Sequence, residues 1–206
     1  MTIEPLTPER VLADLSITDE EVMADLSWPY SAEAEQAKPE HEPGPERTLT
    51  VSWDDPLEHL PLRRHLSGRE YLERMRRGEI PPPPIARLMG FDVVEIGYGR
   101  ATFECTPGEQ HYNPIGVVHG GLAATLLDSV MGCAVDTLQP AGAGYTTLEL
   151  KINFTRPITL DTGRVLAEGT VIHSGARVAT AEGRIFSART GKLLAHGTST
   201  LLLIGQ

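Results

Sequence analysis

Residues 113 to 138, NPIGVVHGGLAATLLDSVMGCAVDTL, constrain the fold more than any other part of the chain. After a His-Gly-Gly turn, the residues are almost all small or apolar, which predicts one long helix. Its large apolar side chains recur at helical spacing and predict one buried stripe, formed by Leu122, Leu126, Val130 and Cys133. A helix that is apolar on nearly all sides needs burial all round.

A single acid, Asp128, lies on another face of this helix. Residues three and four positions apart are neighbours on a helix, so the acid is surrounded by small residues: Gly121, Ala124, Thr125 and Gly132. A face of small side chains is typical of close approach by a second chain, a ligand or both. Carboxylates are rarely buried without a partner. Asp128 is therefore either a structural acid that hydrogen-bonds nearby backbone or a functional group.

The start of the helix favours the functional interpretation. Two glycines follow His119 and leave backbone N–H groups uncovered at the positive end of the helix dipole. Such donors suit a carbonyl oxygen on which negative charge develops. Asp128 lies two and a half turns further along, too far for it to act on the same atom as Gly120 of its own helix. An acid from one subunit paired with the glycine turn of another would resolve this separation.

These residues resemble a known family. The order Asn113, His119-Gly120-Gly121 and Asp128, at these spacings, is similar to the core motif of the PaaI-like (phenylacetic acid degradation) acyl-CoA thioesterases, in the 4-hydroxybenzoyl-CoA thioesterase superfamily. The resemblance runs from about residue 71 to residue 204 and includes the segments 146–158, 173–179 and 190–200. It implies an α+β hotdog fold, in which a curled antiparallel sheet wraps around one long central helix.

The resemblance also implies roles for five residues in thioester hydrolysis. The Gly120 N–H would polarise the thioester carbonyl, and Asp128 would be the general base or the nucleophile, since a carboxylate can do either. Asn113 matches a position that contacts the thioester or the attacking water. Thr147 matches a position that orients that water, although an ordinary strand threonine is the alternative. His119 would shape the turn and the hydrogen bonds of the site rather than act as the base.

The substrate implied by the resemblance is an acyl-CoA, whose phosphates call for basic residues. Arg156 and Arg177 match places that the family uses around the coenzyme, although a solvated surface arginine is the alternative for each. Gly121, Gly175 and Ala176 could offer backbone N–H groups to the substrate. No cofactor is expected, because coenzyme A is part of the substrate. The small number of aromatic residues favours a medium or long aliphatic acyl group.

Composition excludes several other classes of protein. The net charge of −10 argues against a nucleic-acid surface. No apolar run approaches the length of a membrane span, and the N-terminus lacks the pattern of a signal peptide. The two cysteines suit reduced core residues of a cytoplasmic protein. No metal is expected, because the spacing of the histidines does not resemble a zinc site, and a serine triad has no G-x-S-x-G motif to support it.

The sequence divides into an N-terminal extension, residues 1–66, and a hotdog thioesterase domain, residues 67–206. The extension is expected to contain two short helices before residue 30 and an acidic, Pro-rich linker at 31–47. Residues 48–55 could form a short strand that docks Trp53 on the core. The domain is expected to begin with a helix capped by Ser67 and Glu70.

Six strands are expected in the domain, at about 91–97, 100–106, 145–154, 164–173, 176–186 and 192–204. In the third of these, Leu148, Leu150 and Ile152 alternate with Thr147 and Glu149. This two-residue period places the two sets on opposite faces of the sheet.

The sequence therefore predicts an acyl-CoA thioesterase that works as a homodimer or a tetramer. Two alternatives stay open at this point. One is a non-catalytic acyl-CoA or acyl-carrier binding module that keeps the hotdog fold. The other is an interaction protein in which the N-terminal arm matters more than the pocket.

Overall fold

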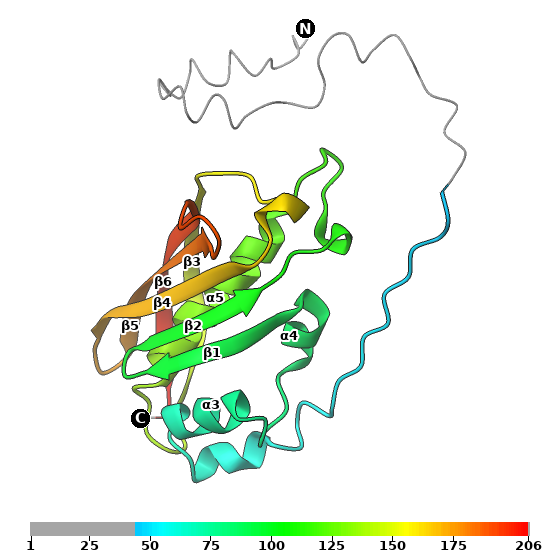
Figure 1. Cartoon of the computed structure of the whole chain (residues 1–206). Helices are drawn as coiled ribbons and strands as arrows, with labels where there is room; N and C mark the ends of the chain where they lie inside the picture. Colours follow the sequence, from blue (N-terminus) through cyan, green and yellow to red (C-terminus); the bar gives the residue numbers. More distant parts are fainter. Residues whose placement is uncertain (1–43, 206) are drawn as a thin grey trace, which may run out of the picture. The chain divides into compact units, whose positions relative to one another are not determined.

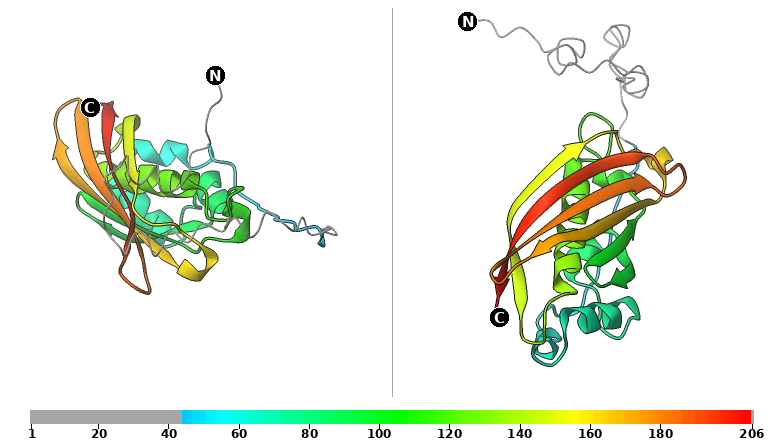
Figure 2. Two further views of the ribbon diagram at one scale, coloured as in Figure 1. Left: turned by 90° about the horizontal axis from the view of Figure 1, so that it is seen from above. Right: turned by 90° about the vertical axis from the view of Figure 1, so that its left-hand side faces the viewer.

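The computed structural model describes residues 44–205, and these form an α+β fold (Figure 1). A six-stranded antiparallel sheet with the order β1-β2-β4-β5-β6-β3 curves around helix α5 (Figure 2). The strands are β1 (Phe91–Gly97), β2 (Arg100–Cys105), β3 (Gly144–Phe154), β4 (Val165–Ser174), β5 (Val178–Ser187) and β6 (Leu193–Ile204). The helices are α3 (Gly68–Arg76), α4 (Pro84–Met89) and α5 (Gly120–Asp136), with short 3₁₀ turns η2 (Leu60–Arg64), η3 (Glu109–His111) and η4 (Leu160–Thr162). The expected hotdog architecture and strand segments are confirmed.

Helix α5 fills the concave side of the sheet, as its apolar sequence requires. Leu122, Leu126 and Val130 are all buried in the core. The sheet comes so close to the helix that Gly169 on β4 has no room for a side chain. A Cβ there would lie 2.5 Å from the Val130 carbonyl oxygen. The helix and the strand therefore approach each other backbone to backbone, and the position of α5 is fixed from the sheet side.

Strand β3 contains a bulge that the sequence did not reveal. Its register against β6 shifts between Thr147 and Glu149, so Leu148 has no direct partner and 57% of its surface is exposed. A bulge adds one residue and reverses which face the following side chains occupy. Thr147 therefore faces helix α5 together with Leu150 and Ile152. The prediction that Thr147 and these apolar residues lie on opposite faces is wrong, because strict alternation assumes an unbroken ladder.

The segment before the sheet forms helices α3 and α4. The capping box predicted for Ser67 and Glu70 is present, and α4 ends at Gly90, which adopts a left-handed φ of 66°. The strand expected at residues 48–55 is wrong: these residues pair with no strand of the described sheet, and Trp53 is 58% exposed. Without a partner, a strand gains no ladder hydrogen bonds.

Other expectations for the N-terminal extension are not decided by the structure. The helices expected before residue 30 and most of the linker lie outside residues 44–205. The domain boundary expected between residues 66 and 67 stays a prediction. Within the described part of the chain, every helix is too short or too polar to cross a lipid bilayer.

Candidate active site

The site is organised around a hydrogen bond between Asp128 and Thr147. The Thr147 hydroxyl on β3 donates to Oδ1 of Asp128 on α5 across 2.8 Å, and both side chains are partly buried. The bulge at Leu148 makes this contact possible, because it turns Thr147 towards the helix. Within residues 44–205, no group donates to the second carboxylate oxygen, Oδ2. One oxygen is thus fixed by the protein, and the other is free to accept a proton or attack a carbon.

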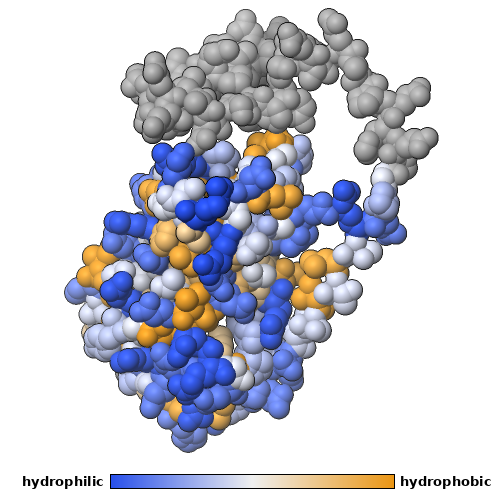
Figure 3. Space-filling model, viewed as in Figure 1, coloured by the Kyte–Doolittle hydropathy of each residue, from blue (hydrophilic) through white to orange (hydrophobic). Residues whose placement is uncertain are grey.

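Asp128 opens onto a cavity of about 210 Å³ between α5 and the segment that precedes the sheet. The wall is mostly apolar and includes residues of α3, α4, β1, β2, α5 and β3: Leu72, Met75, Pro82, Pro83, Ile85, Ala86, Phe91, Asp92, Val93, Phe103, Asp128, Ser129, Cys133, Tyr145 and Thr147. On the outer surface, apolar side chains show as patches separated by polar ones (Figure 3). A concave apolar space with a few polar groups at one place is typical of a small-molecule site.

The glycine turn begins helix α5. His119 is the N-cap residue, and its Nδ1 accepts a hydrogen bond of 2.8 Å from the Gly121 N–H. The backbone N–H of His119 donates to the carbonyl of His111. The Gly120 N–H donates to no group within residues 44–205. Both glycine N–H groups were predicted to be uncovered. The Gly121 N–H is instead used by the N-cap residue, and the Gly120 N–H stays available as a donor at the positive end of the helix.

The loop that leads into this turn is held by Asn113. Its Oδ1 accepts hydrogen bonds from the Ile115 and Val117 N–H groups, at 3.1 and 3.2 Å. These contacts give Asn113 a role in shaping the loop. The same loop contains His111, one of the histidines whose spacing does not resemble a zinc site. His111 is buried, its Nδ1 accepts from the Gly108 N–H, and burial lowers its pKa. No periodic pattern marks this histidine.

Within one chain, Gly120 and Asp128 do not meet. Eight residues of helix separate them, which corresponds to about 12 Å. Gly120 lies at the end of the sheet where β3 finishes, because a Cβ on it would lie 3.0 Å from the Phe154 ring. Asp128 lies beside Thr147, nearer the other end of the same strand. A single protomer therefore supplies the acid and the open donor to two separate places.

The predicted coenzyme-binding groups are also separated. Arg156 lies two residues after the end of β3, at the end of the sheet where Gly120 lies, and its Nη1 donates to the Leu193 carbonyl at 3.0 Å. The turn 175–177 lies at the opposite end of the sheet, since Val178 pairs with Leu202, which pairs with Thr146. The strand from residue 147 to residue 154 alone spans about 23 Å. One chain cannot direct both groups at one nucleotide.

In the 175–177 turn, some of the predicted donors are already used. The Gly175 N–H donates to the Val178 carbonyl at 2.9 Å and closes the turn. The Ala176 N–H has no partner within residues 44–205, and the Arg177 side chain is exposed. The same part of the chain contains no group of three or more potential metal ligands.

Comparison with known proteins places this geometry in a family. Residues 115–194, which include the glycine turn, Asp128 and Thr147, match the model of the thioesterase superfamily. Acyl-coenzyme A thioesterase 13 of Homo sapiens is 30% identical over 115 residues, which cover 55% of this chain and 81% of that protein. The chain belongs to the thioesterase superfamily.

Solved structures of this superfamily share the fold. A phenylacetic acid degradation-related protein from Ralstonia eutropha is 29% identical, with a TM-score of 0.58, and the match covers 64% of this chain and 98% of that one. The PaaI protein of E. coli gives a TM-score of 0.59 over 68% of this chain and 97% of its own, at 21% identity, and so shares the fold alone.

Proposed function

We propose that this thioesterase-superfamily protein hydrolyses acyl-CoA to a free acid and coenzyme A. The observation that carries the proposal is the Asp128 carboxylate, which is held on one side by Thr147 and open to an apolar cavity on the other. The relative named acyl-coenzyme A thioesterase 13 supports the substrate class. No cofactor is consumed, because water accepts the acyl group and coenzyme A leaves as the free thiol.

In the general-base route, Asp128 takes a proton from water as the water attacks the thioester carbonyl. The C–S bond then breaks, and the departing coenzyme A thiolate takes up the proton from Asp128. In the nucleophilic route, the carboxylate attacks the carbonyl itself, and the C–S bond breaks to release the coenzyme A thiolate and leave a mixed anhydride. Water then hydrolyses the anhydride to the free acid and restores the carboxylate. In both, the carbonyl oxygen gains negative charge and the open Gly120 N–H at the start of α5 stabilises it. Thr147 keeps the carboxylate oriented through its 2.8 Å hydrogen bond. Asn113 and His119 hold the turn that presents the Gly120 donor.

The donor has to come from a second subunit, because about 12 Å of helix separates Gly120 from Asp128 in one chain. Strand β3 offers a surface for that subunit. Among residues 44–205 it lies at the edge of the sheet and pairs with β6 alone, and it exposes 57% of Leu148 and 59% of Phe154. A long, unpaired edge with exposed apolar side chains is a template for pairing with another chain. The working unit is therefore a homodimer or a tetramer built from it.

The same arrangement brings together the coenzyme-binding groups. Arg156 of one subunit and the turn with Ala176 and Arg177 of the other would then meet the phosphates of one acyl-CoA. A reducing, cytoplasmic location is part of the proposal. Burial raises the pKa of Cys105 to about 11 and that of Cys133 to about 12, so neither thiol is activated for disulfide exchange.

The test is release of free thiol from a panel of short, long and aromatic acyl-CoAs. Asp128→Asn keeps the shape of the side chain and removes the base, so we expect a loss of kcat of about 100-fold or more. Asp161→Asn, at an exposed acid of η4, is the matched control and should keep the wild-type rate. Retention of most of the activity in Asp128→Asn would refute the mechanism. Binding of acyl-CoA without release by the wild type would instead support a non-catalytic binding module.

A further inference from the structure

We infer that the cavity beside Asp128 receives the acyl group and that Met75 and Ile85, on the segment before the sheet, limit the length of that group. The inference rests on the proposed function and adds a substrate class to it: short to medium, compact acyl groups.

The cavity has a reactive end and an apolar end. Asp128, Ser129 and Thr147 provide polar groups from α5 and β3, and the exposed acid Asp92 adds one from β1. Cys133 and Tyr145 also line it, and Cys133 lies five residues further along α5, about 7.5 Å from Asp128. A thioester carbonyl placed at Asp128 therefore directs its acyl chain along α5 towards the end of the helix, where the wall is apolar.

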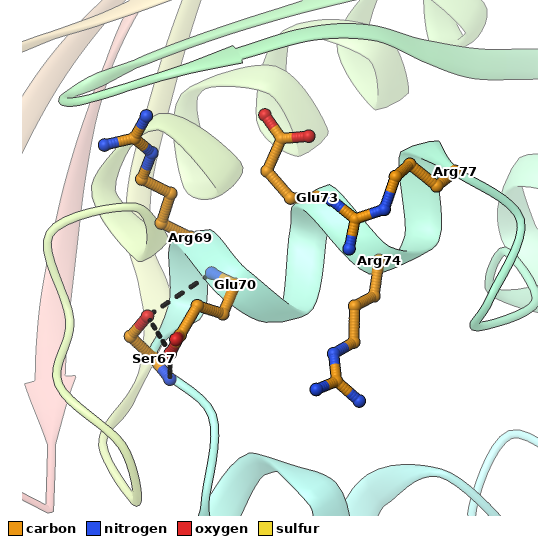
Figure 4. Close-up of a pocket in the computed structure, with 6 residues that line it drawn as sticks. All are labelled: Ser67, Arg69, Glu70, Glu73, Arg74 and Arg77. Atoms are coloured by element: carbon orange, nitrogen blue, oxygen red, sulfur yellow. Dashed lines mark hydrogen bonds between the residues drawn. The ribbon is translucent and has the colours of Figure 1, made fainter.

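The wall opposite α5 comes from α3, the Pro-rich turn and α4. Leu72 is buried on the inner side of α3, and Met75, one turn later, reaches the cavity. Ile85 of α4 also lines it and is 45% exposed, at the rim. The charged residues of α3 and its C-cap line a separate hollow of the surface: Arg69, Glu70, Glu73, Arg74 and Arg77 (Figure 4). The helix is thus amphipathic, with its apolar side turned to the cavity.

This wall is fastened to the end of α5. The Arg63 guanidinium makes two hydrogen bonds with the Asp136 carboxylate, at 2.8 and 2.5 Å. The Gly68 N–H donates to the Gln139 carbonyl, and a Cβ on Gly68 would lie only 1.9 Å from the Asp136 carbonyl oxygen. Helix α3 therefore starts in backbone contact with the end of α5, and it cannot move outwards without breaking these contacts. The cavity has a fixed far wall.

A fixed wall sets an upper limit on the acyl group. At about 30 Å³ for each water-sized group, the cavity of about 210 Å³ holds roughly seven such groups. Each methylene that enters it should improve kcat/KM about fourfold until the space is full. Longer chains should gain nothing further or lose activity, because the additional carbons meet α3 and α4. Composition favoured a medium or long acyl group, and the size of the cavity instead favours short to medium acyl groups.

The experiment measures kcat/KM of the full chain for acetyl-, butyryl-, hexanoyl-, octanoyl-, dodecanoyl- and palmitoyl-CoA. Met75→Ala and Ile85→Ala should move the optimum to longer chains, and Met75→Trp should move it to shorter ones. Leu88→Ala is the matched control for Ile85→Ala, because Leu88 is also on α4 and half exposed but does not line the cavity. It should leave the chain-length profile unchanged.

Binding of S-alkyl-CoA thioethers of the same lengths provides a second measurement, because these ligands have no carbonyl to hydrolyse. In the wild type, we expect the affinity to rise with alkyl length and to level off at the length that is optimal for hydrolysis. In the variants, this length should shift in the same direction as the optimum for hydrolysis. If the protein hydrolyses acyl-CoA but every Met75 and Ile85 variant keeps the wild-type dependence on chain length, the inference is overturned and the proposed function stands. Absence of hydrolysis in the wild type, with a thioether profile that still shifts, would overturn the proposed function and support the cavity assignment.

Discussion

Breaking the ion pair between Arg63 and Asp136 should destabilise the protein strongly. Only 18% of the Arg63 side chain and 6% of the Asp136 side chain are exposed, and burial raises the pKa of Asp136 while Arg63 opposes that rise. The arginine also donates to the Ala143 carbonyl and lies 5.1 Å from the centre of the Tyr71 ring. Arg63→Met would leave a buried carboxylate without its cation, at the C-terminal end of α5 where the helix dipole disfavours negative charge.

The expected loss in free energy of unfolding is about 3–5 kcal/mol, the usual cost of removing one partner of a buried pair. For a folded unit of this size, it corresponds to a fall in Tm of very roughly 6–20 °C. Replacing both partners, Arg63→Met with Asp136→Leu, should recover most of the loss, because no charge is then buried. Urea denaturation followed by circular dichroism measures all of these values.

The pair between Arg77 and Glu79 is a matched control. It is equally short, at 2.6 Å, but about half of each side chain is exposed. Water screens exposed pairs, which contribute little to stability, so Arg77→Met should be nearly neutral. If Arg63→Met cost no more than Arg77→Met, the wall of the cavity would not be held by this pair, and the reasoning would be refuted.

Two further predictions concern the start of α5. Gly120→Ala should keep the fold, since its Cβ would meet only the exposed Phe154 ring, at 3.0 Å. The new methyl group should crowd the carbonyl site and lower kcat/KM for acyl-CoA by about 10- to 100-fold. Turnover at the wild-type rate would contradict this prediction. Burial lowers the pKa of His111, so the neutral form is favoured in the folded state, and the free energy of unfolding should fall as pH drops below about 6.5. Urea denaturation at pH 7.5 and 5.5 measures this fall in the free energy of unfolding. The fall should be smaller in His111→Asn, which keeps an acceptor for the Gly108 N–H, than in the wild type. An equal fall in both proteins would exclude His111 as the cause.

Local patterns in the sequence predicted most of the elements around the site. The apolar periodicity and the His-Gly-Gly turn located α5, and Ser67 with Glu70 located the start of α3. These signals are local, because helix caps and side-chain periods depend on residues a few positions apart. Thr147 was identified only through the family resemblance, since its strand pattern placed it on the wrong face. The bulge that corrects this depends on the pairing of β3 with β6, which no local pattern records.

By itself, the sequence predicted the long apolar helix, because periodicity and capping are local signals. It predicted the hotdog fold and the candidate site residues through a spaced motif that resembles a known family. Only the tertiary structure decided that Thr147 reaches Asp128, that Arg63 fastens α3 to the end of α5, and that a cavity of about 210 Å³ lies between them. Arg63 and Asp136 are 73 positions apart, and the cavity walls come from six elements. Such contacts arise when distant segments pack together, so their geometry depends on the shape of the assembled core.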